Sequence, residues 1–243
     1  MLGRTMHGIA YDAAHDEFTV PQQFAQAIMT FRGGANGEEP PVRIIQGSKT
    51  QLRDPDRLDI DAVHNEIYVP MDGGILVFPR EANGNVAPIR ILKAAGDVRI
   101  GDAVAVDPVH NLLVAQGTVN RQMQLLIFNR TDEGTVKPKA MIGGPKSRLR
   151  SLGGPFTIYP PKGEIIVSIR GGGEYAELAS DESFVGVWST DDNGDVPPKW
   201  IIGGPNGVLQ MPRGVTLDPK NKSMLVSDKR LNAVLTFYFP EMF

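Results

Sequence analysis

Cysteine is absent from this sequence, which excludes disulfides, thiolate zinc sites and cysteine nucleophiles. The absence does not identify a compartment, so the localisation stays open. An excess of charge of one sign is missing too, because 25 Lys and Arg and 28 Asp and Glu give a net charge of −3. Nucleic acids and anionic membranes bind clustered basic residues, and we therefore expect neither as a partner.

Long apolar runs are also missing. No stretch of about 18 consecutive apolar residues occurs, and the first residues, MLGRTMHGIAYD, lack the apolar segment of a signal peptide. We therefore expect a soluble chain without a signal peptide or a membrane span. Glycine and proline are plentiful, at 27 and 19 of 243 residues, and they indicate many turns and few long helices.

A repeated pattern starts at four aromatic residues, Phe31, Phe78, Phe128 and Trp188. A glycine follows each of them after six residues, a proline after ten, and an Ile or Leu after fourteen. Glycine suits a tight turn that needs positive φ, and proline suits the start of a returning strand. The pattern predicts four outer β-hairpins.

A second pattern precedes the first and occurs five times, for example as RLDIDAVHNEIYV. A short run ends at a polar residue, a turn of polar residues follows, and a β-rich run returns, which predicts an inner hairpin. The residues that end these runs are Asp12, Asp61, Asp107, Tyr159 and Asp218, at spacings of 49, 46, 52 and 59 residues. We expect the aspartates to cap the turns through hydrogen bonds to the backbone, and His15, His64 and His110 to be turn residues.

Four strands per period of this length indicate the blades of an all-β propeller. We expect one domain over residues 1–243, with repeats at roughly 1–47, 48–96, 97–144, 145–204 and 205–243. The last blade is incomplete, because only six residues follow Phe237. The chain therefore has about five visible four-stranded blades, either as a five-bladed propeller or as a fragment of a six-bladed one. An open edge near VLTFYFPEMF favours self-association.

The pattern Gly-Ile-x-x-Asp, a polar turn, Glu-Ile-x-Val and an Ile-x-Val-Phe run resembles NHL-type β-propeller repeats, with RLDIDAVHNEIYV and GILVFPREANG as the best local match. The resemblance covers essentially the whole chain and implies a propeller. It leaves the activity open, because such propellers include binding modules, lactonase- and esterase-like hydrolases, and lyases. The chain departs from the pattern at Arg57, Ala103 and Pro155, which replace the repeat glycine, and at Tyr159, which replaces the aspartate.

In propellers of this kind, the starts of the inner strands and the ends of the second strands share one face, and we call these places the rim positions. On the inner strands they are His7, Asp56, Asp102, Gly154 and Arg213. On the second strands they are Gln22, Asp72, Gln116, Arg170 and Asp228. The candidate ligand-binding residues among them are Asp56, Asp72, Asp102, Gln116, Arg170, Arg213 and Asp228.

The fourth repeat carries an insertion, IRGGGEYAELASDESF, at residues 169–184. Long loops on a rigid scaffold often bind ligands, and Glu174 and Tyr175 are the candidates here. A tolerated insertion without a function explains the segment equally well. Arg43 and Arg90, on the outer strands, are expected to be solvated or edge-protecting charges.

Two functions remain open. The leading interpretation is a non-enzymatic binding or scaffold module without a cofactor, which uses the rim and the 169–184 loop to hold a protein, peptide or glycan. The alternative is a calcium-dependent lactonase- or esterase-like hydrolase or lyase, because carboxylates and amides from several blades are the ligands that calcium prefers. Its metal ligands would be Asp56, Asp72, Asp102 and Asp228, with Gln116 nearby and His7 as general base. Gly154 and Arg213 count against a metal, since one brings no ligand and the other brings a positive charge.

Overall fold

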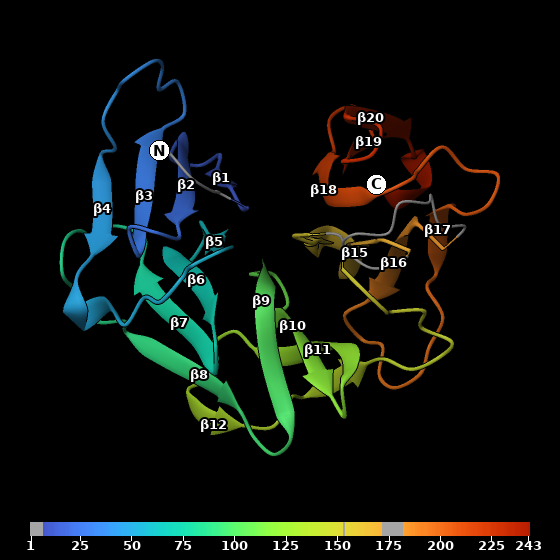
Figure 1. Ribbon diagram of the computed structural model, residues 1–243, viewed down its shortest axis with the longest axis horizontal. Helices are drawn as coiled ribbons and strands as arrows, with labels where there is room; N and C mark the ends of the chain where they lie inside the picture. The colour runs from blue at the N-terminus through green and yellow to red at the C-terminus, as the bar shows by residue number, and fades with distance from the viewer. Residues whose placement is uncertain (1–6, 153, 172–181) are drawn as a thin grey trace. The chain divides into compact units, whose positions relative to one another are not determined.

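The computed structural model describes residues 7–152, 154–171 and 182–243, and strands make up nearly all of its regular structure (Figure 1). The helical segments in these ranges are three 3-10 turns, Ser48–Thr50 (η1), Pro160–Lys162 (η2) and Pro240–Met242 (η3). In the same ranges, no helix has the length and apolar character needed to cross a membrane.

The strands form five sheets, the blades of a β-propeller, which we number in chain order. Blade 1 contains β1 (Ala10–Asp12), β2 (Glu17–Gln22), β3 (Ala27–Arg32) and β4 (Arg43–Gln46). Blade 2 contains β5 (Asp59–Asp61), β6 (Glu66–Met71), β7 (Gly74–Pro79) and β8 (Arg90–Ala94). Blade 3 contains β9 (Val98–Asp107), β10 (Leu112–Val119), β11 (Gln122–Asn129) and β13 (Ala140–Ile142).

The two remaining blades follow the same order. Blade 4 contains β14 (Thr157–Tyr159), β15 (Glu164–Ile169), β16 (Phe184–Ser189) and β17 (Trp200–Gly203). Blade 5 contains β18 (Pro212–Asp218), β19 (Ser223–Asp228) and β20 (Ala233–Tyr238). One further strand, β12 (Gly134–Val136), comes from the outer turn of the third repeat and pairs in parallel with β8 of blade 2.

This architecture confirms the predicted all-β propeller with five visible blades. Among the described residues the last blade has three strands, in the order β18, β19, β20. The glycines of the four predicted outer turns, Gly37, Gly84, Gly134 and Gly194, have φ values of 62°, 80°, 72° and 84°. Because L-residues avoid this region, the repeated glycine is a requirement of the hairpin. Self-association through the edge of β20 stays a prediction.

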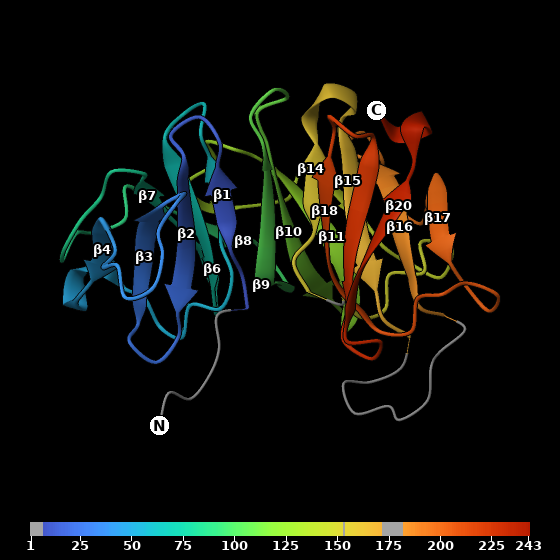
Figure 2. The same ribbon diagram turned by 90° about the horizontal axis from the view of Figure 1, so that it is seen from above.

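The chain divides into two compact units, which we describe separately. Unit 1 comprises Met1–Asn120 and Leu126–Lys139, and unit 2 comprises Arg121–Leu125 and Ala140–Phe243. Blades 1 and 2 belong to unit 1, and blades 4 and 5 belong to unit 2. Figure 2 shows the strands of blade 1 next to one another in unit 1, as their pairing requires.

Each unit has its own apolar core. In unit 1, Ile28 and Ile45 of blade 1 pack with Ile67, Val69 and Phe78 of blade 2, and all five are at most 2% exposed. In unit 2, a second core joins β15, β16, β18 and β19, through Ile166, Val185, Val187, Val215, Met224 and Val226. Burial of each such side chain contributes about 1.5–3 kcal/mol, so the packing of one blade on the next is the main source of stability.

The aspartates at the inner turns cap the turns, as predicted. Asp61 Oδ1 accepts the backbone N–H groups of Val63 and His64 at 3.0 and 2.9 Å, and Asp61 Oδ2 lies 2.7 Å from His64 Nδ1. Asp12 and Asp107 repeat these contacts with their own turns. The histidines at these turns are therefore structural.

Arginines connect consecutive blades within unit 1. Arg130 Nη1 donates to Glu66 Oε2 at 2.7 Å, and Arg80 Nη1 donates to Glu17 Oε2 at 2.7 Å. In each case the arginine follows the aromatic residue of one blade, and the glutamate begins the second strand of the preceding blade. A buried charge is tolerated only with a partner, so each pair ties the two blades together.

The expectation that Arg43 and Arg90 are solvated charges is wrong. Arg90 donates to both oxygens of Glu66 at 2.6 and 2.7 Å, and Arg43 forms an ion pair with Glu17. Although burial acts to raise it, hydrogen bonds from Arg90 and the charges of Arg90 and Arg130 hold the pKa of Glu66 below its ordinary value.

The outer turn provides a second link to the preceding blade. In blade 2, Gly84 forms a parallel bridge with Ile45, and its N–H donates to the carbonyl of Ile44 at 2.6 Å. Asn83 Oδ1 accepts the N–H of Ile44 at 2.9 Å. Blade 4 repeats the arrangement in unit 2, with the bridge Ile142–Gly194 and the hydrogen bond from the N–H of Met141 to Asn193 at 3.1 Å.

We predict that Asn83→Ala lowers the free energy of unfolding by about 1 kcal/mol, because the N–H of Ile44 loses its acceptor. Asn36→Ala is the matched control. Asn36 precedes the turn glycine of blade 1 in the same way, and no side-chain hydrogen bond is found for it among the described residues. Urea unfolding should show a smaller loss for Asn36→Ala, and equal losses would contradict the link between blades.

Asp59 connects the inner strands of blades 2 and 3 within unit 1. Its Oδ2 accepts the N–H of Val106 at 2.8 Å, and its Oδ1 accepts the N–H of Ile60 at 2.9 Å. Burial raises the pKa of Asp59 to about 6 from 3.8, although the two backbone hydrogen bonds act to lower it.

The raised pKa predicts a pH dependence of stability. The folded state binds the proton of Asp59 more tightly than the unfolded state, so this contribution is complete below about pH 4 and is lost as the pH rises through about 6. The loss amounts to at most about 3 kcal/mol. Asp59→Asn keeps an acceptor for Val106 and should be less pH-dependent than the wild type between pH 4 and 7, when unfolding free energies are compared. Parallel curves for the two proteins would refute this assignment.

Candidate functional site

Three predicted rim residues meet in unit 1 around Arg57. Arg57 Nη1 lies 2.5 Å from Asp102 Oδ2 and 3.7 Å from Asp56 Oδ2. His7 Nδ1 hydrogen-bonds to Asp56 Oδ1. Arg57 stands where the repeat pattern has glycine, so this departure from the pattern supplies the positive charge that holds the cluster together.

The position of Arg57 limits what the two carboxylates can bind. The side chain of Arg57 is 11% exposed and that of Asp56 is 16% exposed, so their charges lie largely out of water. A guanidinium between two carboxylates cancels one of their two negative charges and so weakens their attraction for calcium. Within the three described ranges, no group of three or more His, Asp or Glu side chains could hold a metal ion. The geometry therefore does not favour the calcium alternative with His7 as general base.

Gln22 and Gln116 are equivalent rim positions in the predicted pattern. Gln22 ends β2, whereas Gln116 lies within β10, at a register shift between Ala115 and Gly117. The side-chain oxygen Oε1 of each is buried, and it has no hydrogen-bond partner among the described residues. The side chain of Gln116 packs against Gly101, where an added Cβ would lie 3.2 Å from Gln116 Cδ. Both side-chain oxygens are therefore covered by the protein.

Asp228 has a structural environment in unit 2. Its side chain is buried, and its two oxygens accept four backbone N–H groups at 2.8–3.1 Å. The donors are Gln210, Met211, Arg230 and Leu231. The carboxylate thus connects the segment before β18 with the segment after β19. Its oxygens already accept hydrogen bonds from the protein backbone.

The other rim positions of unit 2 differ from one another. Gly154 lies so close to the backbone of Arg213 that an added Cβ would come within 1.7 Å of the Arg213 carbonyl oxygen, which explains the glycine. Arg170 Nε donates to Ser151 Oγ at 3.0 Å. Glu174 and Tyr175, the candidates of the 169–184 loop, lie outside the described residues.

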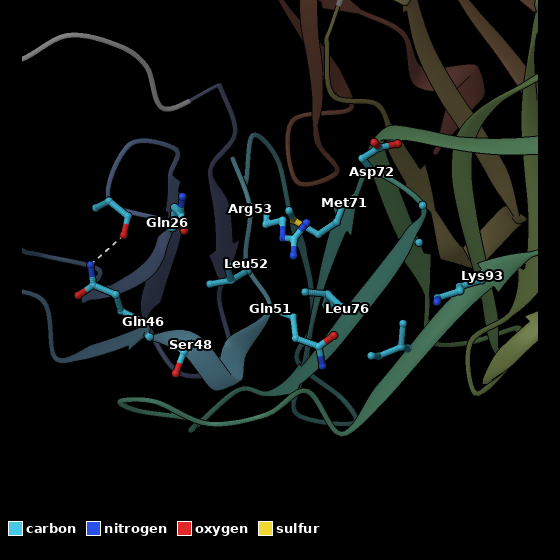
Figure 3. A pocket seen from close by; sticks show the side chains of 15 residues that line it. Gln26, Gln46, Ser48, Gln51, Leu52, Arg53, Met71, Asp72, Leu76 and Lys93 are labelled. Carbon is cyan, nitrogen blue, oxygen red and sulfur yellow. Dashed lines mark hydrogen bonds between the residues drawn. The ribbon is translucent and has the colours of Figure 1, made fainter.

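A cleft in unit 1 has a volume of about 930 Å³ (Figure 3). It lies between blades 1 and 2, where the turn after β2, the end of β4, the η1 segment, and the β6–β7 turn with β8 form its walls. Of the predicted rim residues, Asp72 alone is among the residues that line it.

The floor of this cleft is apolar and its walls are polar. Leu52 and Leu76 are 4% and 5% exposed and belong to the core of unit 1, and Met71 and Ile91 pack against them. The walls carry three glutamines, a serine and three charged side chains, at Gln26, Gln46, Ser48, Gln51, Arg53, Asp72 and Lys93. Figure 3 shows Leu52 and Leu76 in the interior, with Lys93 and Gln46 on opposite sides of the view.

The three charged side chains of the cleft are available to a ligand. Arg53, Asp72 and Lys93 are exposed, and the described residues contain no ion pair or side-chain hydrogen bond for any of them. By contrast, Arg57, Arg80, Arg90 and Arg130 of the same unit are all paired with carboxylates. Sequence analysis did not select Arg53 or Lys93, because neither occupies a rim position. The segment GSKTQLR, which ends at Arg53, recurs as GPKSRLR at residues 144–150 and could have drawn attention to Arg53.

No protein-family model and no curated protein sequence matches this chain. Solved structures do share its fold. A chain of Kuenenia stuttgartiensis hydrazine synthase matches 94% of this chain and 63% of its own length, at 13% identity and a TM-score of 0.62. A chain of the nidogen–laminin complex matches 98% of this chain and 81% of its own length, at 14% identity and a TM-score of 0.58.

A chain of the mitotic checkpoint complex matches 91% of this chain and 58% of its own length, at 12% identity and a TM-score of 0.55. This chain thus spans less than two thirds of the matched chains in the hydrazine synthase and checkpoint structures. At such low identity these similarities establish the propeller fold and leave the activity open.

The Arg57 cluster predicts that calcium does not stabilise the protein. Thermal unfolding after chelation should be unchanged when millimolar calcium is added, because Asp56 and Asp102 are already paired with Arg57. A metal present at 100 times its dissociation constant would instead add about 2.7 kcal/mol. A calcium-dependent rise in the unfolding temperature that Asp102→Ala abolishes would restore the metal-dependent alternative.

Proposed function

We propose that this protein is a non-enzymatic β-propeller binding module that holds a segment of a partner protein in the unit 1 cleft. The observation that carries the proposal is the set of unpaired charges, Arg53, Asp72 and Lys93, above the apolar floor of Leu52 and Leu76. A concave site with an apolar base and a few polar groups at its edge is the usual form of a binding site.

The chemistry of the cleft favours an extended peptide. An apolar side chain of the peptide would cover Leu52 and Leu76, and an acidic side chain would pair with Arg53 or Lys93. The amides of Gln26 and Gln51 can donate to and accept from a peptide backbone. A volume of about 930 Å³ accommodates several residues.

Two further observations support a protein partner. The nidogen–laminin and mitotic checkpoint structures, which share the fold, are by their titles complexes. The resemblance of the repeats to NHL-type propellers, which include ligand-binding modules, agrees with the same role, and we propose that the blades belong to that type.

The proposal is tested by selecting binders from a random peptide library on the wild-type protein and measuring their affinity for the double variant R53E/K93E. Reversing both charges should weaken selected acidic peptides by about tenfold or more, because each lost charge-assisted hydrogen bond contributes roughly 1.5–3 kcal/mol. R99E/K137E makes the same change in net charge at exposed residues outside the cleft and should bind as the wild type does.

Two results would contradict the proposal. Equal loss of affinity in R53E/K93E and R99E/K137E would show that the peptides respond only to net charge. Selection of glycans on an array, with no peptide selected, would assign the cleft to a glycan. Unfolding temperatures of both double variants close to that of the wild type would show that the fold is kept.

A further inference from the structure

Unit 2 contains a pocket of about 290 Å³, and three of the seven residues that line it are arginines. Its charged residues are Arg148, Arg150, Arg170 and Glu182, and its apolar wall consists of Ile169 and Phe184, both about 1% exposed. A neighbouring depression shares Arg148 and Arg150 and adds Arg121. Basic side chains thus concentrate here in a chain whose net charge is −3.

Arg170 is held in place and has an unused donor. Its backbone N–H donates to the carbonyl of Ser151 at 3.1 Å, and its Nε donates to Ser151 Oγ at 3.0 Å. Its Nη1 atom is buried and has no hydrogen-bond partner among the described residues. A buried guanidinium N–H without an acceptor is unfavourable, and an oxyanion in the pocket would supply the acceptor.

An aromatic ring, and not a carboxylate, orients the side chain of Arg148. Its guanidinium lies over the ring of Phe184, with Cζ 4.4 Å from the ring centroid. A cation–π contact uses the face of the guanidinium, so the N–H groups at its edge remain free to donate. Among the described residues, no ion pair or side-chain hydrogen bond is found for this guanidinium.

Glu182, the acidic residue among those that line the pocket, pairs with Arg150. Arg150 Nη1 lies 2.6 Å and 2.7 Å from the two oxygens of Glu182. Two positive charges, on Arg148 and Arg170, therefore remain without a carboxylate partner in the described residues that line this pocket. Two excess charges match an anion that carries two negative charges.

We propose that this pocket binds the dianion of a small phosphomonoester. The phosphate oxygens would accept from Arg170 Nη1 and from the edge of Arg148, and the organic part would occupy the rest of the pocket. Guanidinium groups suit this role because their planar donors match phosphate oxygens. The volume of about 290 Å³ leaves room for an organic group beside the phosphate. This site is independent of the unit 1 cleft.

Isothermal titration calorimetry of the whole chain with phenyl phosphate tests the proposal. The wild type should bind it, and should bind inorganic phosphate more weakly because inorganic phosphate lacks the contacts of the organic part with the rest of the pocket. Affinity for phenyl phosphate should rise between pH 5 and 7.5, since the second pKa of a phosphomonoester is about 6. Phenol should not bind.

Arg170→Gln and Arg148→Gln should each weaken phenyl phosphate by about tenfold or more, as expected for loss of a charge-assisted hydrogen bond. Arg230→Gln removes an exposed arginine of the same unit that does not line the pocket, and its affinity should equal that of the wild type. Circular dichroism and unfolding temperature would confirm that each variant folds. If Arg170→Gln does not fold, Arg170→Lys replaces it in the test.

Three results would overturn the proposal. One is the absence of binding to the wild type at millimolar phenyl phosphate. Another is unchanged affinity in both Arg170→Gln and Arg148→Gln. The third is inorganic phosphate binding as tightly as phenyl phosphate, which would leave a general anion site and remove the phosphomonoester.

Discussion

The hydrogen-bonded link between consecutive blades is the interaction on which the rest of this structure depends. A sheet of four short strands cannot bury both of its faces alone, so each blade is stable only against its neighbours. In unit 1 the link is made by Asn83 and Gly84 on the edge of β4, and in unit 2 by Asn193 and Gly194 on the edge of β13. These contacts satisfy strand-edge groups that would otherwise be exposed or unpaired. They also fix the outer strand of one blade against the turn of the next blade, so that the apolar side chains of the two blades can pack together.

The charged links inside unit 1 follow from the same packing. Glu66 begins β6 and receives Arg90 from its own blade and Arg130 from the next repeat. Buried charges of this kind add little net stability, since desolvation offsets much of their attraction, but an unpaired member would be costly. These ion pairs therefore contribute more to pairing each blade with the correct neighbouring blade than to the free energy of unfolding. The same reasoning separates the paired arginines from Arg53, Lys93, Arg148 and Arg170, for which no carboxylate partner is found in the described residues.

Both proposed sites lie beside segments that connect one blade to the next. The unit 1 cleft is bounded by the η1 segment and by turns whose sequences differ between blades. The arginine pocket of unit 2 involves Arg148 and Arg150, which precede blade 4 in the segment GPKSRLR. The segment GSKTQLR before blade 2 is its counterpart, and it ends at Arg53 of the unit 1 cleft. The aspartates of the inner turns, such as Asp12, Asp61 and Asp107, are occupied by contacts that build the blade. By contrast, the arginines and the lysine proposed to bind ligands have no carboxylate partner among the described residues.

The sequence by itself determined the architecture. Turn glycines at positive φ, aromatic residues at a constant offset and capping aspartates are local requirements of a hairpin, and local requirements can be read from spacing. Only the tertiary structure decided the sites, because a side chain's charge is available or cancelled according to neighbours distant in sequence. Asp56 and Asp102 belong to different repeats, and their pairing with Arg57 became visible only in three dimensions. Asp228 likewise looked like a rim ligand, yet four backbone N–H groups use its oxygens. Spacing cannot report such contacts, since they depend on how one blade packs against the next.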